Sequence, residues 1–222
     1  MAGRQITDSI ILIQGSIHSS FSKRGEKAWL LSLIYLIHFD KVSHSFLFFV
    51  LDKFGFSVPF IKWIKAYITK PWIAPLFNCR LAAFFQASRG LRQGFPLSPL
   101  LFILVIEGLS LLIKDAQNNG KIRGIKISPQ LSLTHLLFVD DLIMFGTGTF
   151  EEWVAFKVIL DTFYAASGMC INMDKPCFLF NNIEEGLLNM ISGSLSFKYE
   201  PITKGFNYLG YYPKPLGYLV KD

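Results

Sequence analysis

The sequence predicts an α+β fold in which an antiparallel sheet packs on helices. Three observations carry this prediction. Two apolar runs flank a pair of aspartates within residues 133–145, a pattern that indicates a β-hairpin. The apolar run Trp29–Val42 is partly β-branched and predicts a central strand that is buried on both faces. Longer segments with helical spacing, such as Phe150–Ser167, predict the helices that cover the sheet.

Periodicity and turn residues predict the elements of the first half in order. Thr7 or Asp8 is expected to cap a helix that runs through isoleucines to about residue 17. A polar loop follows at 19–27. After the central strand, residues 43–54 and 59–68 are expected to be helices, and 69–88 to be strands joined by turns. The second helix is expected to bury one broad face made of Phe60, Ile61, Trp63, Ile64 and Tyr67.

The second half is predicted in the same way. Residues 88–99 form a loop rich in Gly, Pro and Arg that leads into a helix over Leu100–Ile113. A short strand is expected at Ile125–Ser128, and Gly168 is expected to end the helix that follows the aspartate hairpin. Residues 169–175 indicate a strand and turn, 181–204 are weakly patterned, and 206–212 indicate a second hairpin.

Composition limits the function classes. The 222 residues are 51% hydrophobic and 17% charged, which excludes a disordered chain. A formal net charge of +6 permits a polyanionic partner without requiring one. Cys79, Cys170 and Cys177 form no metal-type spacing, so we expect reduced core thiols, no disulfide partner and an intracellular protein. The apolar runs are too short to span a bilayer, so no membrane association is expected.

The adjacent carboxylates Asp140 and Asp141 present an electrostatic problem. Two such charges at ~4 Å repel by about 1 kcal/mol in water and about 4 kcal/mol at a protein-like dielectric. Either the pair lies in a solvated turn, or a cation such as Mg²⁺ offsets the repulsion. Side chains alternate along a strand, so the two carboxylates should diverge. A working metal site would therefore need another acid from elsewhere in the chain.

The loop at 88–99 also has two readings. Gly90 and Gly94 allow close backbone approach, and Arg89, Arg92 and Gln93 offer hydrogen-bond donors. Such loops suit contact with a phosphate or nucleotide. The alternative is a structural turn with solvated arginines, and the residues alone favour neither.

Taken in this order, the segments resemble the polymerase core of reverse transcriptases, in particular those of plant LINE-type non-LTR retrotransposons. The likeness covers nearly the whole chain, and the Arg-Gln-Gly block together with the Asp-Asp hairpin is highly specific. The blocks that carry it are Gly3-Arg4-Gln5-Ile6-Thr7-Asp8-Ser9, Phe39-Asp40-Lys41-Val42-Ser43, Arg89-Gly90-Leu91-Arg92-Gln93-Gly94-Phe95-Pro96-Leu97-Ser98-Pro99, Phe138-Val139-Asp140-Asp141, Ser167-Gly168-Met169-Cys170-Ile171-Asn172-Met173-Asp174-Lys175 and Tyr208-Leu209-Gly210.

The resemblance implies a right-hand polymerase palm with partial fingers. Residues 1–28 would be a partial fingers segment, 29–180 the palm core with a fingers insertion, and 181–222 the end of the palm with a primer-holding hairpin. The implied activity is RNA-directed DNA polymerisation, with RNA template, DNA primer and dNTP as partners. Two Mg²⁺ ions would lie between carboxylates and the triphosphate.

The resemblance also assigns roles to individual residues. Asp140 and Asp141 would be catalytic metal ligands, and Lys175 would donate a proton to pyrophosphate. The incoming nucleotide would contact Arg92, Gln93 and Gly94, with Phe39 as the aromatic gate that tests for a 2′-hydroxyl. The block Tyr208-Leu209-Gly210 would hold the primer end.

One departure from the family pattern affects the activity. The family's first carboxylate block reads roughly Asp-x-x-Lys-Ala-Phe-Asp, and its first Asp is a metal ligand. Here that position falls on Ile34, or on Tyr35 if one residue is deleted, and no acid lies between Trp29 and Phe39. We therefore expect an incomplete two-metal site, and a chain that keeps the fold with little or no polymerase activity.

Two alternatives to an active polymerase remain open. One is a nucleic-acid-binding remnant without catalysis, and the other is an unproductive fragment of a decayed element. The chain begins inside the fingers block and ends soon after the primer block, so we expect a fragment, located inside the cell and possibly in the nucleus.

Overall fold

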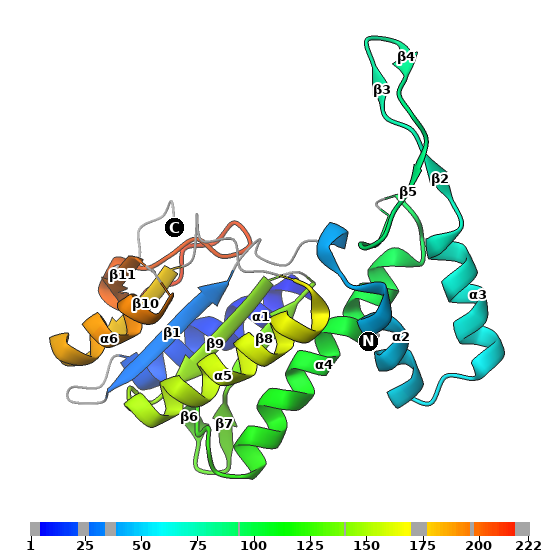
Figure 1. Cartoon of the computed structure of the whole chain (residues 1–222). Coiled ribbons are helices and arrows are strands. Elements are labelled where there is room, and N and C mark those ends of the chain that lie inside the picture. Colours follow the sequence, from blue (N-terminus) through cyan, green and yellow to red (C-terminus); the bar gives the residue numbers. More distant parts are fainter. Residues whose placement is uncertain are drawn as a thin grey trace. The chain divides into compact units, whose positions relative to one another are not determined.

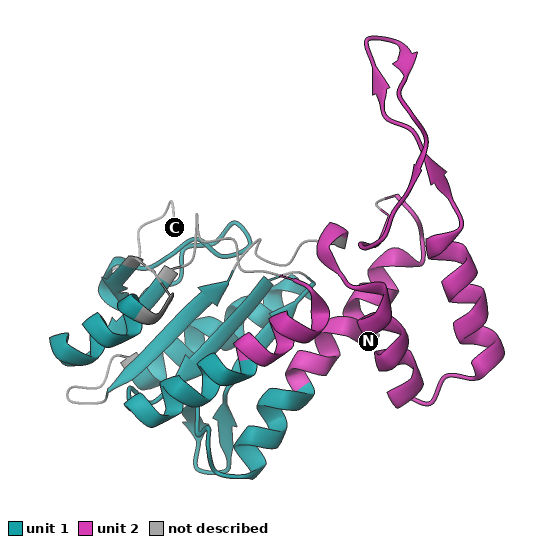
Figure 2. Cartoon of the chain, viewed as in Figure 1, with its two compact units in different colours: residues 1–36, 111–159, 171–222 teal, residues 37–110, 160–170 magenta. Residues whose placement is uncertain are grey.

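The computed structural model describes residues 5–21, 27–33, 39–92, 94–139, 141–169, 177–195 and 198–215. The chain forms two compact units that interleave along the sequence (Figure 2). Unit 1 takes in residues 1–36, 111–159 and 171–222, and unit 2 takes in 37–110 and 160–170. The division into a partial fingers segment (1–28), a palm core (29–180) and a primer-holding end (181–222) stays a prediction. The two units are defined by packing and do not test the function of a segment.

Unit 1 contains a five-stranded sheet in the order β11-β10-β1-β9-β8. Its strands are β1 (Ala28–Leu33), β8 (His135–Phe138), β9 (Asp141–Gly146), β10 (Cys177–Asn181) and β11 (Lys198–Pro201). The central strand β1 pairs antiparallel with both β9 and β10, and all of its residues are buried. The predicted central strand and aspartate hairpin are thus confirmed, and β10 with β11 adds a parallel pair.

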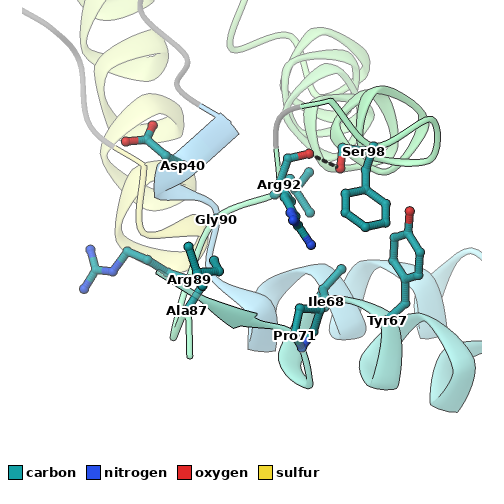
Figure 3. A pocket seen from close by; sticks show the side chains of 12 residues that line it. Asp40, Tyr67, Ile68, Pro71, Ala87, Arg89, Gly90, Arg92 and Ser98 are labelled. Carbon is teal, nitrogen blue, oxygen red and sulfur yellow. Dashed lines mark hydrogen bonds between the residues drawn. The ribbon is translucent and has the colours of Figure 1, made fainter. Parts of the chain in front are cut away.

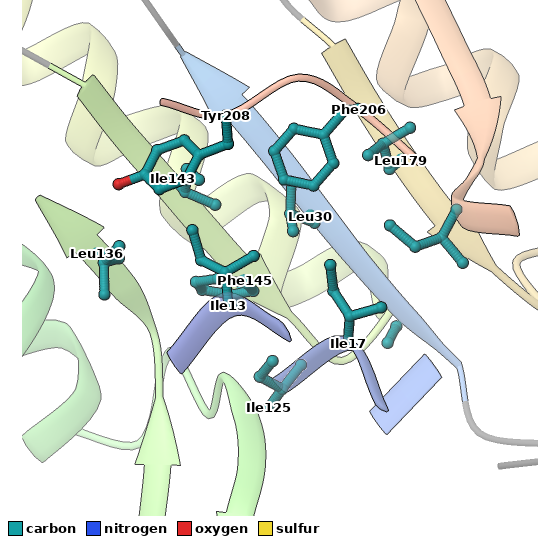
Figure 4. Close-up of a cluster of buried hydrophobic side chains, with 12 residues drawn as sticks. Ile13, Ile17, Leu30, Ile125, Leu136, Ile143, Phe145, Leu179, Phe206 and Tyr208 are labelled. Atoms are coloured by element: carbon teal, nitrogen blue, oxygen red, sulfur yellow. The ribbon is translucent and has the colours of Figure 1, made fainter. Parts of the chain in front are cut away.

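Helix α1 (Ile6–Ser16) covers one face of this sheet (Figure 1). Ile13 of this helix and Ile17 of the π-helical turn Ile17–Phe21 join apolar side chains from five strands and from the C-terminal segment in one cluster (Figure 4). The cluster consists of Ile13, Ile17, Ala28, Leu30, Ile125, Leu136, Ile143, Phe145, Leu179, Ile202, Phe206 and Tyr208. The predicted cap, Thr7 or Asp8, is wrong, because both residues lie inside the helix. The N-cap is Gln5, whose N–H donates to Asp8 Oδ2 at 2.9 Å in a reciprocal capping box.

Helix α5 (Phe150–Ser167) supplies aromatic side chains to the other face. Trp29 of β1 stacks on Phe178 of β10, and its ring meets Trp153 and Phe156 of α5 edge-on at 5.5 and 5.1 Å. Gly146 lies opposite Trp29 in the β1–β9 pair. A Cβ there would lie 2.3 Å from the Trp29 ring, so only glycine leaves room for it.

A buried carboxylate ties α5 to two loops of unit 1. Glu152 Oε1 accepts from the N–H groups of Arg123 and Gly124 at 2.7 and 2.8 Å. Its Oε2 accepts from both the N–H and the hydroxyl of Thr147. The position in the first turn of α5 also favours a negative charge. The loops before β6 (Ile125–Ser128) and after β9 are therefore fixed by one side chain.

The remaining elements of unit 1 include two that the sequence did not indicate. These are α6 (Glu185–Leu195) and β11, which fall in the weakly patterned residues 181–204. Strand β7 (Leu131–Leu133) pairs with β6, and a short 3-10 turn spans Ile202–Lys204. The predicted C-terminal hairpin is reduced to a single bridge between Tyr208 and Tyr211.

Unit 2 is built on helices and a narrow β-ribbon. It contains α2 (His44–Lys53), α3 (Val58–Thr69), the start of α4 (Ser98–Asn118) and the end of α5. The ribbon strands are β2 (Trp72–Ile73), β3 (Leu76–Phe77), β4 (Arg80–Leu81) and β5 (Phe85–Gln86). Gly168, at φ 72°, ends α5 as predicted. Among the described helices, none is long and apolar enough to cross a membrane.

Two expectations for unit 2 are wrong. Ile64 is the only buried residue of α3, and Trp63 is 71% exposed, because little of unit 2 covers that helix. Cys79 is exposed at the tip of the ribbon instead of buried in a core. The side chains of Cys170 and Cys177 lie outside the described part of the chain.

We predict that Glu152→Gln lowers the free energy of unfolding by about 2 kcal/mol or more. The amide would replace one oxygen with a donor that faces buried donors, leaving at least one unsatisfied. Urea denaturation measures the change. Glu151→Gln is the control, because Glu151 is exposed on the same turn. Equal stability of the two variants would contradict the structural role.

We also predict that Gly146→Ala destabilises unit 1 by about 1–3 kcal/mol, because the added methyl group overlaps the Trp29 ring. Gly193→Ala in α6 is the matched control. A Cβ at Gly193 meets nothing within 4 Å, so alanine there should stabilise the helix slightly. Thermal unfolding followed by circular dichroism distinguishes the two, and a melting temperature for Gly146→Ala at or above that of the parent rules the clash out.

Candidate functional site

The aspartate hairpin of unit 1 has a two-residue turn. Phe138, the last residue of β8, pairs with Asp141, the first residue of β9, so two residues separate the strands. Asp141 is 4% exposed, whereas Asp140 lies outside the described residues. Val139 has φ 55°, a left-handed conformation that is unusual for a β-branched residue and stores strain. The turn that carries the aspartates is therefore held by its surroundings against local preference.

The register of the sheet brings the end of β1 to this hairpin. Leu33, the last residue of β1, pairs with Leu142, the neighbour of Asp141. The chain continues with Ile34 and Tyr35, the positions where the family's first metal ligand is expected. Both residues, and the catalytic candidate Lys175, lie outside the described part of the structure.

The donors that the structure describes do not fit a metal centre by themselves. No group of three or more His, Cys, Asp or Glu side chains that could hold a metal ion occurs among the described residues. At the hairpin they contribute the single carboxylate of Asp141. Divalent ions in nucleotide sites are held by carboxylates together with substrate phosphates, so one carboxylate is not sufficient.

In unit 2 the backbone joins two of the sequence blocks. Gly90 N–H donates to the Val42 carbonyl at 2.7 Å, and Ser43 forms a β-bridge with Arg89. Gly90 has φ 84°, and a Cβ there would lie 2.6 Å from the Asp40 carbonyl oxygen. Only glycine permits this approach. The block at residues 39–43 therefore packs directly against the loop that contains the arginines.

Two side chains hold the loop at residues 88–99 through its carbonyl oxygens. His44 Nε2 lies 2.8 Å from the Gly90 carbonyl oxygen. The hydroxyl of Ser98, at the start of α4, donates to the Arg92 carbonyl at 2.7 Å and closes the loop (Figure 3). Within the loop, Gly94 is exposed with φ 83°, and Gln93 lies outside the described residues.

A pocket of about 260 Å³ opens beside this loop. The Arg92 guanidinium lies 4.7 Å from the centre of the Phe95 ring, and Tyr67 meets the same ring edge-on at 4.6 Å. In Figure 3, Arg92 points toward the apolar floor, whereas Arg89 points away. The full lining is Asp40, Tyr67, Ile68, Pro71, Ile73, Ala87, Arg89, Gly90, Leu91, Arg92, Phe95 and Ser98.

The pocket combines apolar walls with the guanidinium of Arg92, which suits a flat ring carrying a nearby anionic group. Its volume lies below the roughly 300–1000 Å³ of pockets that enclose whole drug-sized ligands, so it would hold only part of a nucleotide. Phe39 lies in the 3-10 turn Phe39–Lys41 next to the lining residue Asp40. The sequence did not single out Tyr67 or Ser98 for this site, because nothing local marks their contacts with the loop.

The block Tyr208-Leu209-Gly210 forms a tight turn in unit 1. The N–H of Tyr208 donates to the Tyr211 carbonyl at 2.8 Å, and the reverse bond is 2.9 Å. Leu209 and Gly210 between them have φ 49° and 84°. Tyr208 belongs to the buried cluster under the sheet, and Gly210 is exposed. The turn is thus anchored by a core aromatic and presents its backbone to solvent.

Comparison with known proteins gives relatives among transposable elements. The chain is 28% identical over 221 residues to the transposon TX1 uncharacterized 149 kDa protein of Xenopus laevis, covering 92% of this chain and 16% of that protein. It is 25% identical over 180 residues to the retrovirus-related Pol polyprotein from type-1 retrotransposable element R2 of Popillia japonica, covering 81% of this chain and 27% of that protein. The chain therefore spans a minor part of the length of these relatives.

Structural comparison shows the fold. The telomerase from Candida albicans, solved in complex with a fragment of telomeric RNA, matches 95% of this chain and 33% of its own with a TM-score of 0.62 at 12% identity. The predicted right-hand polymerase palm with partial fingers is thereby confirmed as the fold class. The family model for reverse transcriptase (RNA-dependent DNA polymerase) matches residues 1–212, and the chain therefore belongs to the reverse transcriptase family.

Proposed function

We propose that this reverse transcriptase domain derives from a LINE-type non-LTR retroelement and that its reaction is RNA-directed DNA synthesis. The observation that carries the proposal is the register of the palm sheet, in which Leu33 at the end of β1 pairs with Leu142, the neighbour of Asp141 in the aspartate hairpin. The retrotransposon relatives support the element type. An RNA template, a DNA primer and dNTP are the substrates that this reaction requires.

The proposed catalytic groups are Asp140 and Asp141 as ligands of Mg²⁺, with Lys175 as proton donor. Bound Mg²⁺ would supply charge stabilisation for the triphosphate and the primer oxygen. The ligand set is incomplete, because no acid occurs between Trp29 and Phe39. We therefore propose weak or absent activity in this chain.

The proposed substrate contacts come from the loop and the tight turn. Arg92, Gln93 and Gly94, with Phe39, would contact the incoming nucleotide. The cationic and apolar lining beside Arg92 supports this role. The exposed backbone of the turn at residues 208–210 would contact the primer end.

A second candidate is a nucleic-acid-binding domain without catalysis. The missing acid favours it, since loss of a metal ligand removes chemistry but leaves the folded surface in place. Such a domain would bind nucleic acid through phosphates, with affinity that falls steeply as salt rises. Binding without primer extension distinguishes it from a polymerase.

The first test of the proposal is primer extension on an RNA template with Mg²⁺ or Mn²⁺. We expect little product from the parent chain. Ile34→Asp or Tyr35→Asp should raise the rate by at least about a hundredfold, because a restored metal site contributes several kcal/mol of transition-state stabilisation.

The control variants carry Asn, which keeps the shape of the Asp side chain and removes its charge. Ile34→Asn and Tyr35→Asn should not restore synthesis, and Asp140→Asn in the restored background should abolish it. Robust synthesis by the parent chain that Asp140→Asn abolishes would show that the metal site is complete. No gain from either Asp variant would favour the binding domain.

A second test addresses the nucleotide contact of Arg92. Arg92→Ala should weaken dNTP binding by at least about tenfold in calorimetric titration, because a charge-assisted contact to phosphate is lost. Arg123→Ala is the control, since Arg123 is an exposed arginine that belongs to unit 1 and does not line this pocket. If both variants bind dNTP like the parent chain, the pocket is not the nucleotide contact.

A further inference from the structure

The β-ribbon of unit 2, residues 72–86, projects beyond helices α2 and α3 (Figure 1). Trp72 pairs with Gln86 at its base, and Phe77 pairs with Arg80 next to its tip. Asn78 and Cys79 form the two-residue tip with φ 47° and 59°, the left-handed values of a type I′ hairpin turn. The backbone of the ribbon is therefore a defined hairpin.

Large apolar side chains of the ribbon and of α3 remain uncovered. Phe77 is 75% exposed and Trp72 is 64% exposed, although such residues are normally among the most buried. The full set is Val58, Trp63, Trp72, Leu76, Phe77, Leu81, Phe84 and Phe85. Several large apolar side chains exposed together on one hairpin and its neighbouring helix are typical of an interaction site in a folded protein.

The charge of this part of the chain indicates the class of partner. Residues 54–106 contain no Asp or Glu, and they contain six cations. These are Lys62, Lys65, Lys70, Arg80, Arg89 and Arg92. The formal net charge of the whole chain is +6, so the rest of the chain is balanced and this segment carries the excess. A surface with cations and no acids is complementary to a polyanion.

The strand pairing near the ribbon tip places an exposed apolar side chain next to a cation. Residues directly opposite each other in an antiparallel pair project from the same face. Phe77 and Arg80 are such a pair, so an exposed ring and an exposed guanidinium lie side by side. A ring can stack on a base while the neighbouring cation contacts its phosphate.

We propose that the ribbon and α3 bind single-stranded nucleic acid, with Phe77 and Trp72 stacking on unpaired bases and Arg80 contacting the backbone. The faces of paired bases are covered within a duplex, so exposed rings favour an unpaired strand. Lysine is depleted in protein–protein interfaces, so Lys62 and Lys65 of α3 fit a protein partner less well than a polyanion. The inference rests on the proposed function for the identity of the strand, which would be the template.

The test measures binding of labelled oligouridine and oligodeoxythymidine to the full chain by fluorescence anisotropy. Stacking on an aromatic side chain contributes enough that Phe77→Ala and Trp72→Ala should each weaken binding at least about fivefold. Arg80→Ala should reduce the slope of log affinity against log salt by about 0.7, as expected for one phosphate contact on a single strand. RNA and DNA oligomers compared in parallel identify which strand is preferred.

Matched controls come from unit 1. Phe150→Ala removes an exposed aromatic and Lys121→Ala removes an exposed cation, and neither should change affinity or salt slope. All of these side chains are exposed, so circular dichroism and melting temperature should stay constant across the set. Unchanged binding by Phe77→Ala, Trp72→Ala and Arg80→Ala would overturn the proposal.

A rival occupant of the ribbon is a second copy of this chain. Sedimentation velocity tests it: a dimer that Phe77→Ala converts to a monomer, with oligonucleotide binding unchanged, would also overturn the proposal. The readout is binding, so it does not depend on polymerase activity. Extension by the Ile34→Asp or Tyr35→Asp variants tests the proposed function separately.

Discussion

The burial of β1 on both faces and both edges is the constraint on which unit 1 depends. Its peptide groups pair with β9 and β10, and its side chains alternate between the α1 cluster and the aromatic group around Trp29. Each position of the strand must therefore be apolar or small, since a buried unpaired charge is strongly unfavourable. A metal ligand can only be carried beyond its end, after Leu33. The sheet thus fixes where the first acid of the family would act without depending on that acid.

The loop at residues 88–99 of unit 2 is also held by contacts that do not depend on a catalytic residue. Its contacts with the block at residues 39–43 are backbone hydrogen bonds and the absence of a Cβ at Gly90. Ser98 and His44 then hold the loop through carbonyl oxygens. None of these interactions uses the charge of Arg92 or the chemistry of a bound nucleotide. The fold of a polymerase can consequently persist after the loss of a catalytic carboxylate, which is the state that we propose for this chain.

The excess positive charge and many of the exposed apolar side chains lie in one segment of the chain. The packing of the buried cores does not require this distribution. The side chains that make the ribbon unusual contribute nothing to the buried clusters of unit 1 or to the contact at Gly90. The excess positive charge lies in the same stretch of sequence, residues 54–106. Folding would tolerate acidic residues there. The proposed polyanion with unpaired bases would account for their absence and matches both the rings and the cations.

The sequence by itself determined the elements whose signals are local. The aspartate hairpin, the helix Phe150–Ser167 with its Gly168 terminus, and the buried central strand follow from apolar periodicity and turn residues, and the specific motifs indicated the family. Only the tertiary structure decided that Trp63 is exposed, that Glu152 joins two loops, and that Gly90 packs on Asp40. Helix α6 and strand β11 belong to the second group, because their glycines and polar residues give a weak local pattern. The physical reason is that periodicity reports which residues can be buried, whereas the segments that cover them, and the contacts between residues far apart in the chain, arise only when the chain folds.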